Sequence, residues 1–234
     1  MIKKLTSQDI NQVAKLHRRQ LPGFLSELGE EFLGKFYKVS LGIPEIFTLV
    51  EKRNGQMIAF ACCAESAKDL YGKIIFRDIL SFGMIFLRYF ITHIKDSVKL
   101  VKTLSYPGFR DDIPELLTIA VKKEHQGKGI GRKLFTAAVE EFRKRGVEKF
   151  QISVYDRLPA NKFYQKIGCK FERSFDFLGE KMNYYSYTSF AFRLKTPPRW
   201  PASNCVAVGG TPRTVKELPK TFTSKEPIRS PSRW

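Results

Sequence analysis

The stretch ELLTIAVKKEHQGKGIGRKL, residues 115–134, decides the fold class of this chain of 234 residues. Its first seven residues, Glu115–Val121, form an apolar run of the length of a buried strand. A glycine-rich turn follows, and apolar residues then recur at helical spacing from Leu134 to Phe142, with Gly146 at the end of the helix. A strand, a glycine-rich turn and a long helix in this order predict an α/β domain.

The turn contains Gly127, Gly129 and Gly131. Glycines let the backbone point its amides inward, and the helix that starts near Gly129 adds unpaired amides and the positive end of its dipole. Three basic side chains surround the turn: Lys128, Arg132 and Lys133. These features suit a phosphate group, although a basic turn ahead of an ordinary helix would look the same. The glycine spacing matches neither the P-loop nor the dinucleotide-binding pattern.

The rest of the pattern predicts a mixed sheet flanked by helices. In the first half we expect a strand over 2–5, a helix capped by Thr6 or Ser7, a helix over about 26–40 and a hairpin around Asn54 and Gly55. In the second half we expect a strand over 147–154, a short helix over 159–168 and a final strand or hairpin arm over 183–194. Strand–helix–strand units imply parallel neighbours with right-handed crossovers.

Two motifs occur in a fixed order. The turn fits the pattern Q/R-x-x-G-x-G/A as Gln126, Gly129 and Gly131. The later stretch PANKFYQKIGCKF fits A-x-x-F-Y-x-x-x-G-F as Ala160, Phe163, Tyr164 and Gly168, with Cys169 where phenylalanine is usual. Together they resemble the GNAT superfamily of acetyl-CoA-dependent N-acetyltransferases, over about residues 1–194. The resemblance implies an α/β (α+β) fold whose mostly antiparallel sheet is splayed between two adjacent parallel strands.

By this resemblance the chain uses acetyl-CoA as a cosubstrate. The turn would hold the pyrophosphate of coenzyme A through Gln126, Gly127, Lys128, Gly129, Ile130, Gly131, Arg132 and Lys133. The pantetheine would bond to the backbone of Ile119, Ala120 and Val121 as an added strand does, if a bulge splays this strand from the next. Asn161 is a further expected contact, although the asparagine that the family often carries four residues earlier is Arg157 here.

Acetyl transfer to an amine needs a base for the amine proton, donors for the developing oxyanion and an acid for the departing thiolate. By resemblance the general acid is Tyr164, whose alternative role is that of a core aromatic on an amphipathic helix. Backbone amides near Ala120 and Val121 could stabilise the oxyanion.

The general base is less sharply indicated. Glu115 lies eleven residues before Gln126, the spacing of the catalytic glutamate in the histone-acetylating branch of the family, and it could act directly or through a water. A solvated carboxylate at the start of a strand is the alternative. Asp111 and Asp112 are other candidates, and the position of another branch's glutamate is Ile152 here.

Residues 69–104 are very apolar for a connector. A membrane span needs about 20 mostly apolar residues, and Arg77, Asp78 and Arg88 interrupt any such window. We expect a helical insertion that covers the sheet or a cleft. The alternative is an amphipathic element, over 72–104, that lies on a membrane or on a partner.

The net charge of +18 favours polyanionic partners without choosing among them. No zinc-finger, helix-turn-helix or RNP-like pattern is present, so we expect no specific nucleic-acid binding. The histidines and cysteines lack ligand spacing, which predicts free thiols and no metal. The first residues hold no apolar core of signal-peptide length, so we expect a cytoplasmic protein that could touch a membrane peripherally. Residues 196–234 read as a basic, proline-rich disordered tail behind a domain over 1–195.

The prediction is an N-acetyltransferase that moves acetyl from acetyl-CoA to a primary amine by direct attack in a ternary complex. A small acceptor such as an amino sugar is favoured, and another small amine or a protein amine is also compatible. The alternative is a basic module that binds a membrane or a partner on a degenerate acyltransferase scaffold.

Overall fold

The computed structural model describes residues 1–92, 112–177 and 179–189. The chain separates into two compact units, Met1–Thr196 and Pro197–Trp234. The second unit, with the predicted tail over 196–234, lies outside the described residues, and so do residues 93–104 of the predicted insertion.

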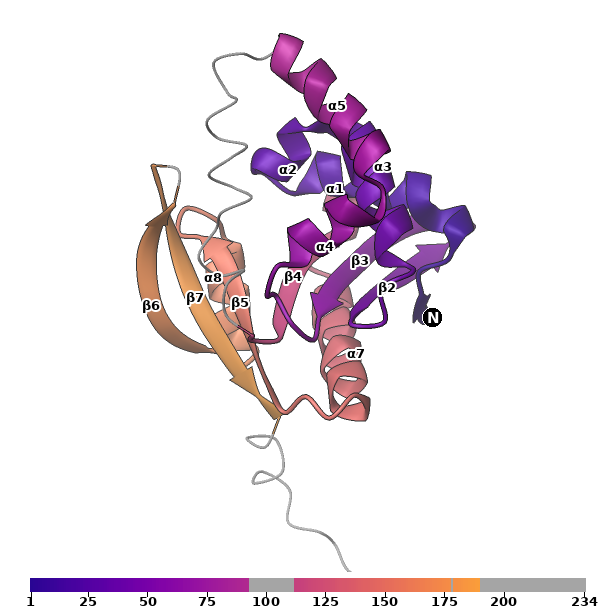
Figure 1. Ribbon diagram of the computed structural model, residues 1–234. Helices are drawn as coiled ribbons and strands as arrows, with labels where there is room; N and C mark the ends of the chain where they lie inside the picture. Colours follow the sequence, from indigo (N-terminus) through magenta and orange to yellow (C-terminus); the bar gives the residue numbers. More distant parts are fainter. Residues whose placement is uncertain (93–111, 178, 190–234) are drawn as a thin grey trace, which may run out of the picture. The chain divides into compact units, whose positions relative to one another are not determined.

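A seven-stranded sheet forms the centre of the first unit, in the order β1-β2-β3-β4-β5-β7-β6. The strands are β1 Ile2–Lys4, β2 Ile46–Arg53, β3 Gln56–Ala64, β4 Glu115–Val121, β5 Lys149–Tyr155, β6 Lys170–Phe177 and β7 Glu180–Thr188. All neighbours pair antiparallel except β4 and β5, which are parallel. Figure 1 shows β2, β3 and β4 on one side and β5, β7 and β6 as a wing on the other. The predicted mixed, mostly antiparallel sheet is therefore confirmed.

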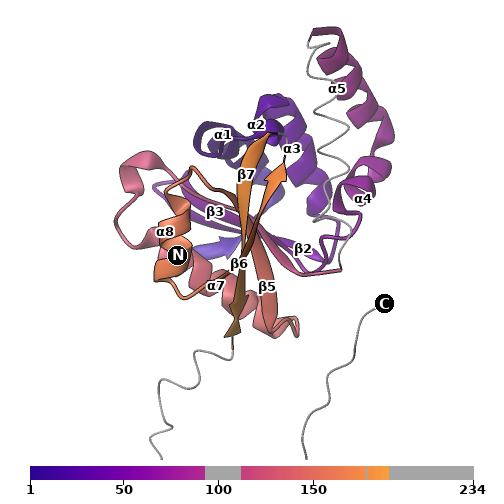
Figure 2. The same cartoon turned by 90° about the vertical axis from the view of Figure 1, so that its left-hand side faces the viewer.

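Helices cover both faces of the sheet (Figure 2). On one face lie α1 Ile10–Gln20, α2 Phe24–Glu27, α3 Gly29–Ser40, α4 Leu70–Arg77 and α5 Ile79–Thr92. On the other lie α7 Ile130–Lys144 and α8 Ala160–Lys166, and two 3-10 turns, Ser7–Asp9 and Lys123–His125, precede α1 and α7. Apolar side chains of these helices fill a separate core on each face of the sheet, and α5 joins its core through α3.

The sequence reading differs from the fold at two elements. The helix expected over about 26–40 is two helices, because Gly29 takes a φ of +93° between α2 and α3. Strand β6 was not predicted, and a register shift between Phe171 and Arg173 interrupts its alternation, so Phe171 lies opposite Tyr185 while Phe175 stacks on Tyr184 of the other face. Most residues of β6 are exposed at the sheet edge, and this weakens the apolar signal.

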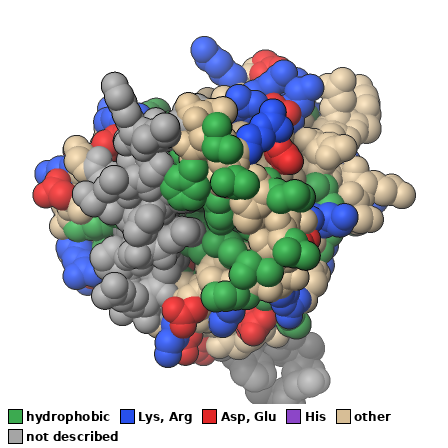
Figure 3. Space-filling view, turned by 45° about the horizontal axis from the view of Figure 1, so that its top comes forward, with side chains coloured by type: hydrophobic (Ala, Val, Ile, Leu, Met, Phe, Trp, Pro, Cys, Tyr) green, Lys and Arg blue, Asp and Glu red, His purple; other side chains and the backbone are tan. Residues whose placement is uncertain are grey.

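The insertion ahead of β4 begins as the helical pair α4 and α5, as predicted. It packs on α3, where the rings of Phe32 and Phe82 meet edge to face at 5.6 Å. The opposite face of the pair is exposed and apolar through Phe76, Ile79, Leu80, Met84, Leu87 and Ile91. Figure 3 shows apolar side chains gathered on this side of the molecule. No helix in the described ranges combines the length and the apolar character of a membrane span.

Candidate active site

The sheet opens between β4 and β5. Along β4 the pairing with β3 runs from Val121 to Glu115 but skips Leu117, which forms a bulge. On its other edge β4 pairs with β5 at one position only, Glu115 with Gln151. A bulge bends its strand, so the edge of β4 beyond Glu115 diverges from β5. The expected splay between two parallel strands is present.

The open edge of β4 presents alternate backbone groups. The Lys122 amide donates to the Ile58 carbonyl at 2.8 Å, so this residue faces β3. In an antiparallel ladder backbone groups alternate between the two edges. The amides of Ile119 and Val121 therefore point to the open edge, and Ala120 pairs with Phe60 of β3. Of the three residues predicted to bind an extended ligand through their backbone, Ile119 and Val121 present their amides at the open edge, and the binding itself stays a prediction.

A glycine loop, residues 126–133, connects this edge to α7. Gly127 and Gly129 adopt φ values of +73° and +76°, in the region that favours glycine. Gly129 is the N-cap of α7 and has no side chain to cap the first amides of the helix. The Gln126 side chain donates to the Val121 carbonyl at 2.9 Å, which ties the loop to the end of β4.

Charged side chains surround the glycine loop. Lys133 and Arg132 are exposed at the start of α7, and Lys133 Nζ lies 3.6 Å from Glu51 Oε1. Lys128 Nζ donates to the Glu124 carbonyl at 2.9 Å, across the turn. Ile130 is buried in the core under α7, and Gly131 packs beside the Phe163 ring. The loop thus combines free helix amides with nearby cations, as a phosphate site requires.

Glu115 is buried at the point where β4 and β5 part, with 2% of its surface exposed. Ser153 Oγ donates to its Oε1 at 2.6 Å. Its Oε2 has no hydrogen-bond partner among the described residues. Burial raises the pKa of this carboxyl to about 7 against the effect of the Ser153 bond. The alternative of a solvated strand-start carboxylate is wrong, because the side chain is inside the protein.

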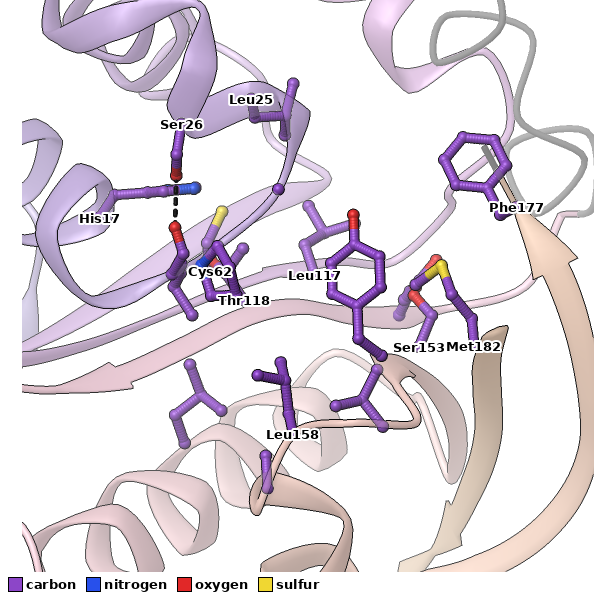
Figure 4. A pocket seen from close by; sticks show the side chains of 18 of the residues that line it. His17, Leu25, Ser26, Cys62, Leu117, Thr118, Ser153, Leu158, Phe177 and Met182 are labelled. Carbon is purple, nitrogen blue, oxygen red and sulfur yellow. Dashed lines mark hydrogen bonds between the residues drawn. The ribbon is translucent and has the colours of Figure 1, made fainter. Parts of the chain in front are cut away.

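Tyr164 and Glu115 line the same cavity of about 210 Å³, which we call the inner cavity. Tyr164 sits on α8 with its ring 5.8 Å from that of Tyr185. Burial raises the pKa of the Tyr164 phenol well above its usual value, so the phenol keeps its proton at neutral pH. Figure 4 shows how side chains from helices and strands converge on this space.

His17 also lines the inner cavity, and it was not selected from the sequence. Its Nδ1 lies 2.7 Å from the Tyr37 hydroxyl, and its ring stacks on Phe60 at 5.9 Å. Burial lowers the pKa of His17 to about 4, so the imidazole is neutral at pH 7. Its spacing from Val13 on α1 was a usable signal that it faces inward.

Asn161 is held inside the protein. Its Nδ2 donates to the carbonyls of Tyr155, Asp156 and Leu158 at 2.8–3.0 Å. Its Oδ1 accepts from Asn183 Nδ2 and from the Tyr185 hydroxyl. The side chain fixes the turn between β5 and α8, so a coenzyme A contact by this side chain stays a prediction.

The other residues considered from the sequence have different surroundings, and of these Cys62 lines the inner cavity. Asp112 is exposed ahead of β4, Asp111 lies outside the described residues, and Ile152 is buried in the core. Cys62 and Cys63 are free thiols that belong to cores on opposite faces of the sheet, as their adjacency on a strand predicts. In the described ranges no group of histidine, cysteine and carboxylate side chains could hold a metal ion.

Comparison with known proteins places these features in context. Residues 10–169 match the model of the acetyltransferase (GNAT) family. None of the curated proteins matches the sequence. Among solved structures the chain is similar to a GNAT-family protein from Desulfovibrio desulfuricans, with 16% identity and a TM-score of 0.55 over 81% of this chain and 98% of that one.

Two further solved structures show the same fold. One is the PaiA N-acetyltransferase from Thermoplasma acidophilum in complex with coenzyme A, with 17% identity and a TM-score of 0.51 over 80% of this chain and 98% of that one. The other is the ribosomal-protein-alanine N-acetyltransferase from Brucella melitensis, with 16% identity and a TM-score of 0.53 over 80% and 99%.

Proposed function

Because the chain belongs to the acetyltransferase (GNAT) family, we propose that it transfers the acetyl group of acetyl-CoA to a primary amine by direct attack in a ternary complex. The observation that carries this proposal is the convergence of Glu115 and Tyr164 on the inner cavity, beside the open edge of β4. Direct attack needs acetyl-CoA and the amine to be bound at the same time. The open edge of β4 suits acetyl-CoA, and the adjacent cavity suits the amine.

The residues beside the cavity fit coenzyme A. The free amides at the start of α7 and the cations Lys128, Arg132 and Lys133 suit its pyrophosphate. The open edge at Ile119 and Val121 suits the amides of its pantetheine arm. When bound, acetyl-CoA supplies the thioester that is attacked. A backbone amide of this open edge is the group we assign to the developing oxyanion.

We assign the role of general base to Glu115, directly or through a water. The amine nitrogen can form a bond to the acetyl carbon only after it loses its extra proton. A carboxyl with a pKa of about 7 accepts that proton near neutral pH, where an ordinary carboxylate is a weak base. Its unpaired Oε2 is a ready acceptor.

We assign the role of general acid to Tyr164. As the carbon–sulfur bond breaks, the electron pair moves to sulfur, and a phenol can give that sulfur a proton. The raised pKa of Tyr164 keeps the phenol protonated until then. The extra proton of the ammonium group thus passes to Glu115, and the phenolic proton passes to the thiolate. After the attack the nitrogen gives up a second proton, which restores the phenol of Tyr164 directly or through solvent. The products are an amide and free coenzyme A, and Glu115 releases its proton to solvent.

Binding and turnover test the proposal. Calorimetry should detect acetyl-CoA binding to the folded protein, and thiol release should then depend on an added amine. Glu115→Gln should bind acetyl-CoA normally but release little thiol. A control variant, Glu172→Gln, changes an exposed carboxylate on β6 and should behave as wild type. Folded protein that binds no acetyl-CoA would contradict the proposal.

A second proposal concerns the exposed apolar face of α5. Leu80, Met84, Leu87 and Ile91 recur on it every three or four residues and are each more than half exposed. We propose that this face lies on an anionic membrane surface at the cytoplasmic side, to which a chain of net charge +18 is attracted. The part of the predicted contact over 93–104 lies outside the described residues.

Vesicle flotation tests this second proposal. Protein should float with vesicles that contain phosphatidylserine and less with neutral vesicles. Combined substitution Leu80→Ser, Met84→Ser and Leu87→Ser should abolish flotation, whereas Leu41→Ser, at an exposed leucine beyond α3, should not. Equal recovery of wild type with both vesicle types at low salt would contradict it.

A further inference from the structure

The inner cavity, which Glu115 and Tyr164 line, is also lined by several large apolar side chains. Leu25, Leu117, Leu158, Phe177 and Met182 approach it from different elements. Figure 4 shows these five side chains around one space, with His17 on the helix side and Ser153 on the strand side. At about 210 Å³ the space is larger than the roughly 150 Å³ apolar cavity that binds benzene. Ile119 of the open edge also lines it, so this space takes the acyl end of the donor together with a ring or a short alkyl chain of the acceptor.

The charge of the lining is more informative than its size. The chain contains 41 lysines and arginines, yet none of the described residues around the inner cavity is a lysine or an arginine. His17 is neutral because burial lowers its pKa to about 4. A phosphate or carboxylate placed here would be buried without a cation, which is strongly unfavourable. Among the described residues of the lining Glu115 is the one carboxyl, and it suits an ammonium group instead.

An outer cavity of about 440 Å³ shares Pro22, Tyr155 and Phe177 with the inner one. Its lining includes the charged side chains Arg18, Glu27, Arg157 and Glu180. Arg157 Nε lies 2.5 Å from Glu180 Oε2, so that cation is already paired. Besides Glu115 and His17, the described polar side chains of the inner cavity carry hydroxyl or thiol groups, among them Ser153 and Thr118. Charged parts of an acceptor would thus find their partners beyond Tyr155 and Phe177, at a distance from Glu115.

We propose that the acceptor is a primary amine with an apolar body, aliphatic or aromatic, next to the amino group, and without an anionic group near it. This inference rests on the proposed acetyl transfer and narrows its substrate class. The ammonium group lies toward Glu115, and the apolar body fills the space among the leucine, methionine and phenylalanine side chains. Amino sugars and phosphorylated amines are disfavoured acceptors.

A panel of amines tests this inference in two separate readouts. Calorimetry with coenzyme A-loaded protein measures amine binding, and thiol release measures turnover. Along ethylamine, butylamine and hexylamine we expect kcat/KM to rise about fourfold per methylene, which corresponds to about 0.8 kcal/mol for each buried CH₂. Phenethylamine should be a good acceptor, and glucosamine and phosphoethanolamine should be at least about a hundredfold poorer than hexylamine.

A matched pair of variants checks the location. Phe177→Ala should remove most of the gain from ethylamine to hexylamine, because Phe177 lines both cavities. Phe171→Ala lies on the same strand outside the cavities and should keep the gain.

Failure of this inference can be distinguished from failure of the proposed acetyl transfer. Glucosamine or phosphoethanolamine as the best acceptor, or no binding of the apolar amines, would overturn this inference. Binding of apolar amines without thiol release would instead overturn the proposed acetyl transfer.

Discussion

The donor region and the acceptor region that we propose for this protein are built in different ways. The donor region is one continuous stretch, from β4 through the glycine loop to the start of α7. The groups that we expect to bind acetyl-CoA there are mainly backbone amides. The acceptor region is the inner cavity, whose side chains come from helices and strands far apart in the sequence. A motif can encode the first because its geometry is local. The second exists only after the chain has folded.

The two regions meet at Glu115. This residue begins β4, and it is also the single position where β4 pairs with β5. Substitutions on the donor side should therefore change the affinity for acetyl-CoA, and substitutions in the cavity should change turnover or acceptor choice. Residues at the meeting point should change turnover most.

The largest effect is expected for Glu115→Gln. The variant keeps the size of the side chain but cannot take up the amine proton, so kcat should fall by about a thousandfold. Acetyl-CoA affinity should stay within about twofold, as calorimetry can show. If the variant kept near wild-type turnover, water alone would accept the amine proton.

The pH profile provides the control for this variant. Burial raises the pKa of Glu115 to about 7, so the base is protonated and inactive below that pH. In wild type, kcat/KM should therefore rise with pH up to about pH 7, as Glu115 loses its proton, and this rise should level off above pH 7. The break should be missing in Glu115→Gln, and a break that persists would belong to another group.

The next effect is expected for Tyr164→Phe. Loss of the phenolic proton should slow turnover by about a hundredfold while the affinity for acetyl-CoA changes little. Tyr185→Phe removes the neighbouring hydroxyl that donates to Asn161, and it tests whether any lost tyrosine hydroxyl has the same effect. If both variants slow turnover equally, the role of Tyr164 is structural.

A smaller effect, confined to the donor region, is expected for Gly129→Ala. Gly129 and Gly146 lie at the two ends of α7 with φ values of +76° and +78°, and a Cβ at either meets no atom within 4 Å. Both substitutions should destabilise the fold by roughly 1–2 kcal/mol of strain, measurable as a lower Tm. Only Gly129→Ala should weaken acetyl-CoA binding, by about tenfold. Equal affinities for the two variants would remove the glycine loop from the cofactor site.

The smallest effect is expected for Gln126→Ala. The variant loses the bond from the Gln126 side chain to the Val121 carbonyl, which is exposed and therefore contributes about 1 kcal/mol or less. Acetyl-CoA affinity should fall by about threefold with kcat unchanged. A large loss of kcat would show that the loop also positions the reacting groups.

The sequence predicts the donor region well because its signals are short-range. The strand Glu115–Val121 has the expected bounds, and α7 begins one residue after Gly129. Prediction from the sequence fails where a residue's hydrogen-bond partners are distant in the sequence. Nothing near Asn161 indicates that Asn183 and Tyr185 from β7 engage its side-chain oxygen.

The acceptor region was predicted only in part for the same reason. Glu115 was selected from its spacing to Gln126, but its burial depends on the packing of β5 and α4 around it. His17 carries an inward spacing on α1, yet its place beside the cavity follows from where α1 settles on the sheet. That no lysine or arginine occurs among the described residues of the lining is a property of the folded protein, and no sequence pattern indicates it.

The single pairing between β4 and β5 has a consequence for how such a protein can diverge. Phe177 and Met182 stand on the wing of β5, β7 and β6, whereas the glycine loop belongs to the other half of the sheet. Because β4 and β5 pair at one register position, side chains at the far end of the wing can change without altering a strand pairing with the half that we expect to bind the donor. Descendants of one ancestor could therefore acquire new acceptors while they inherit the same donor, and their wings should differ in sequence more than their loops.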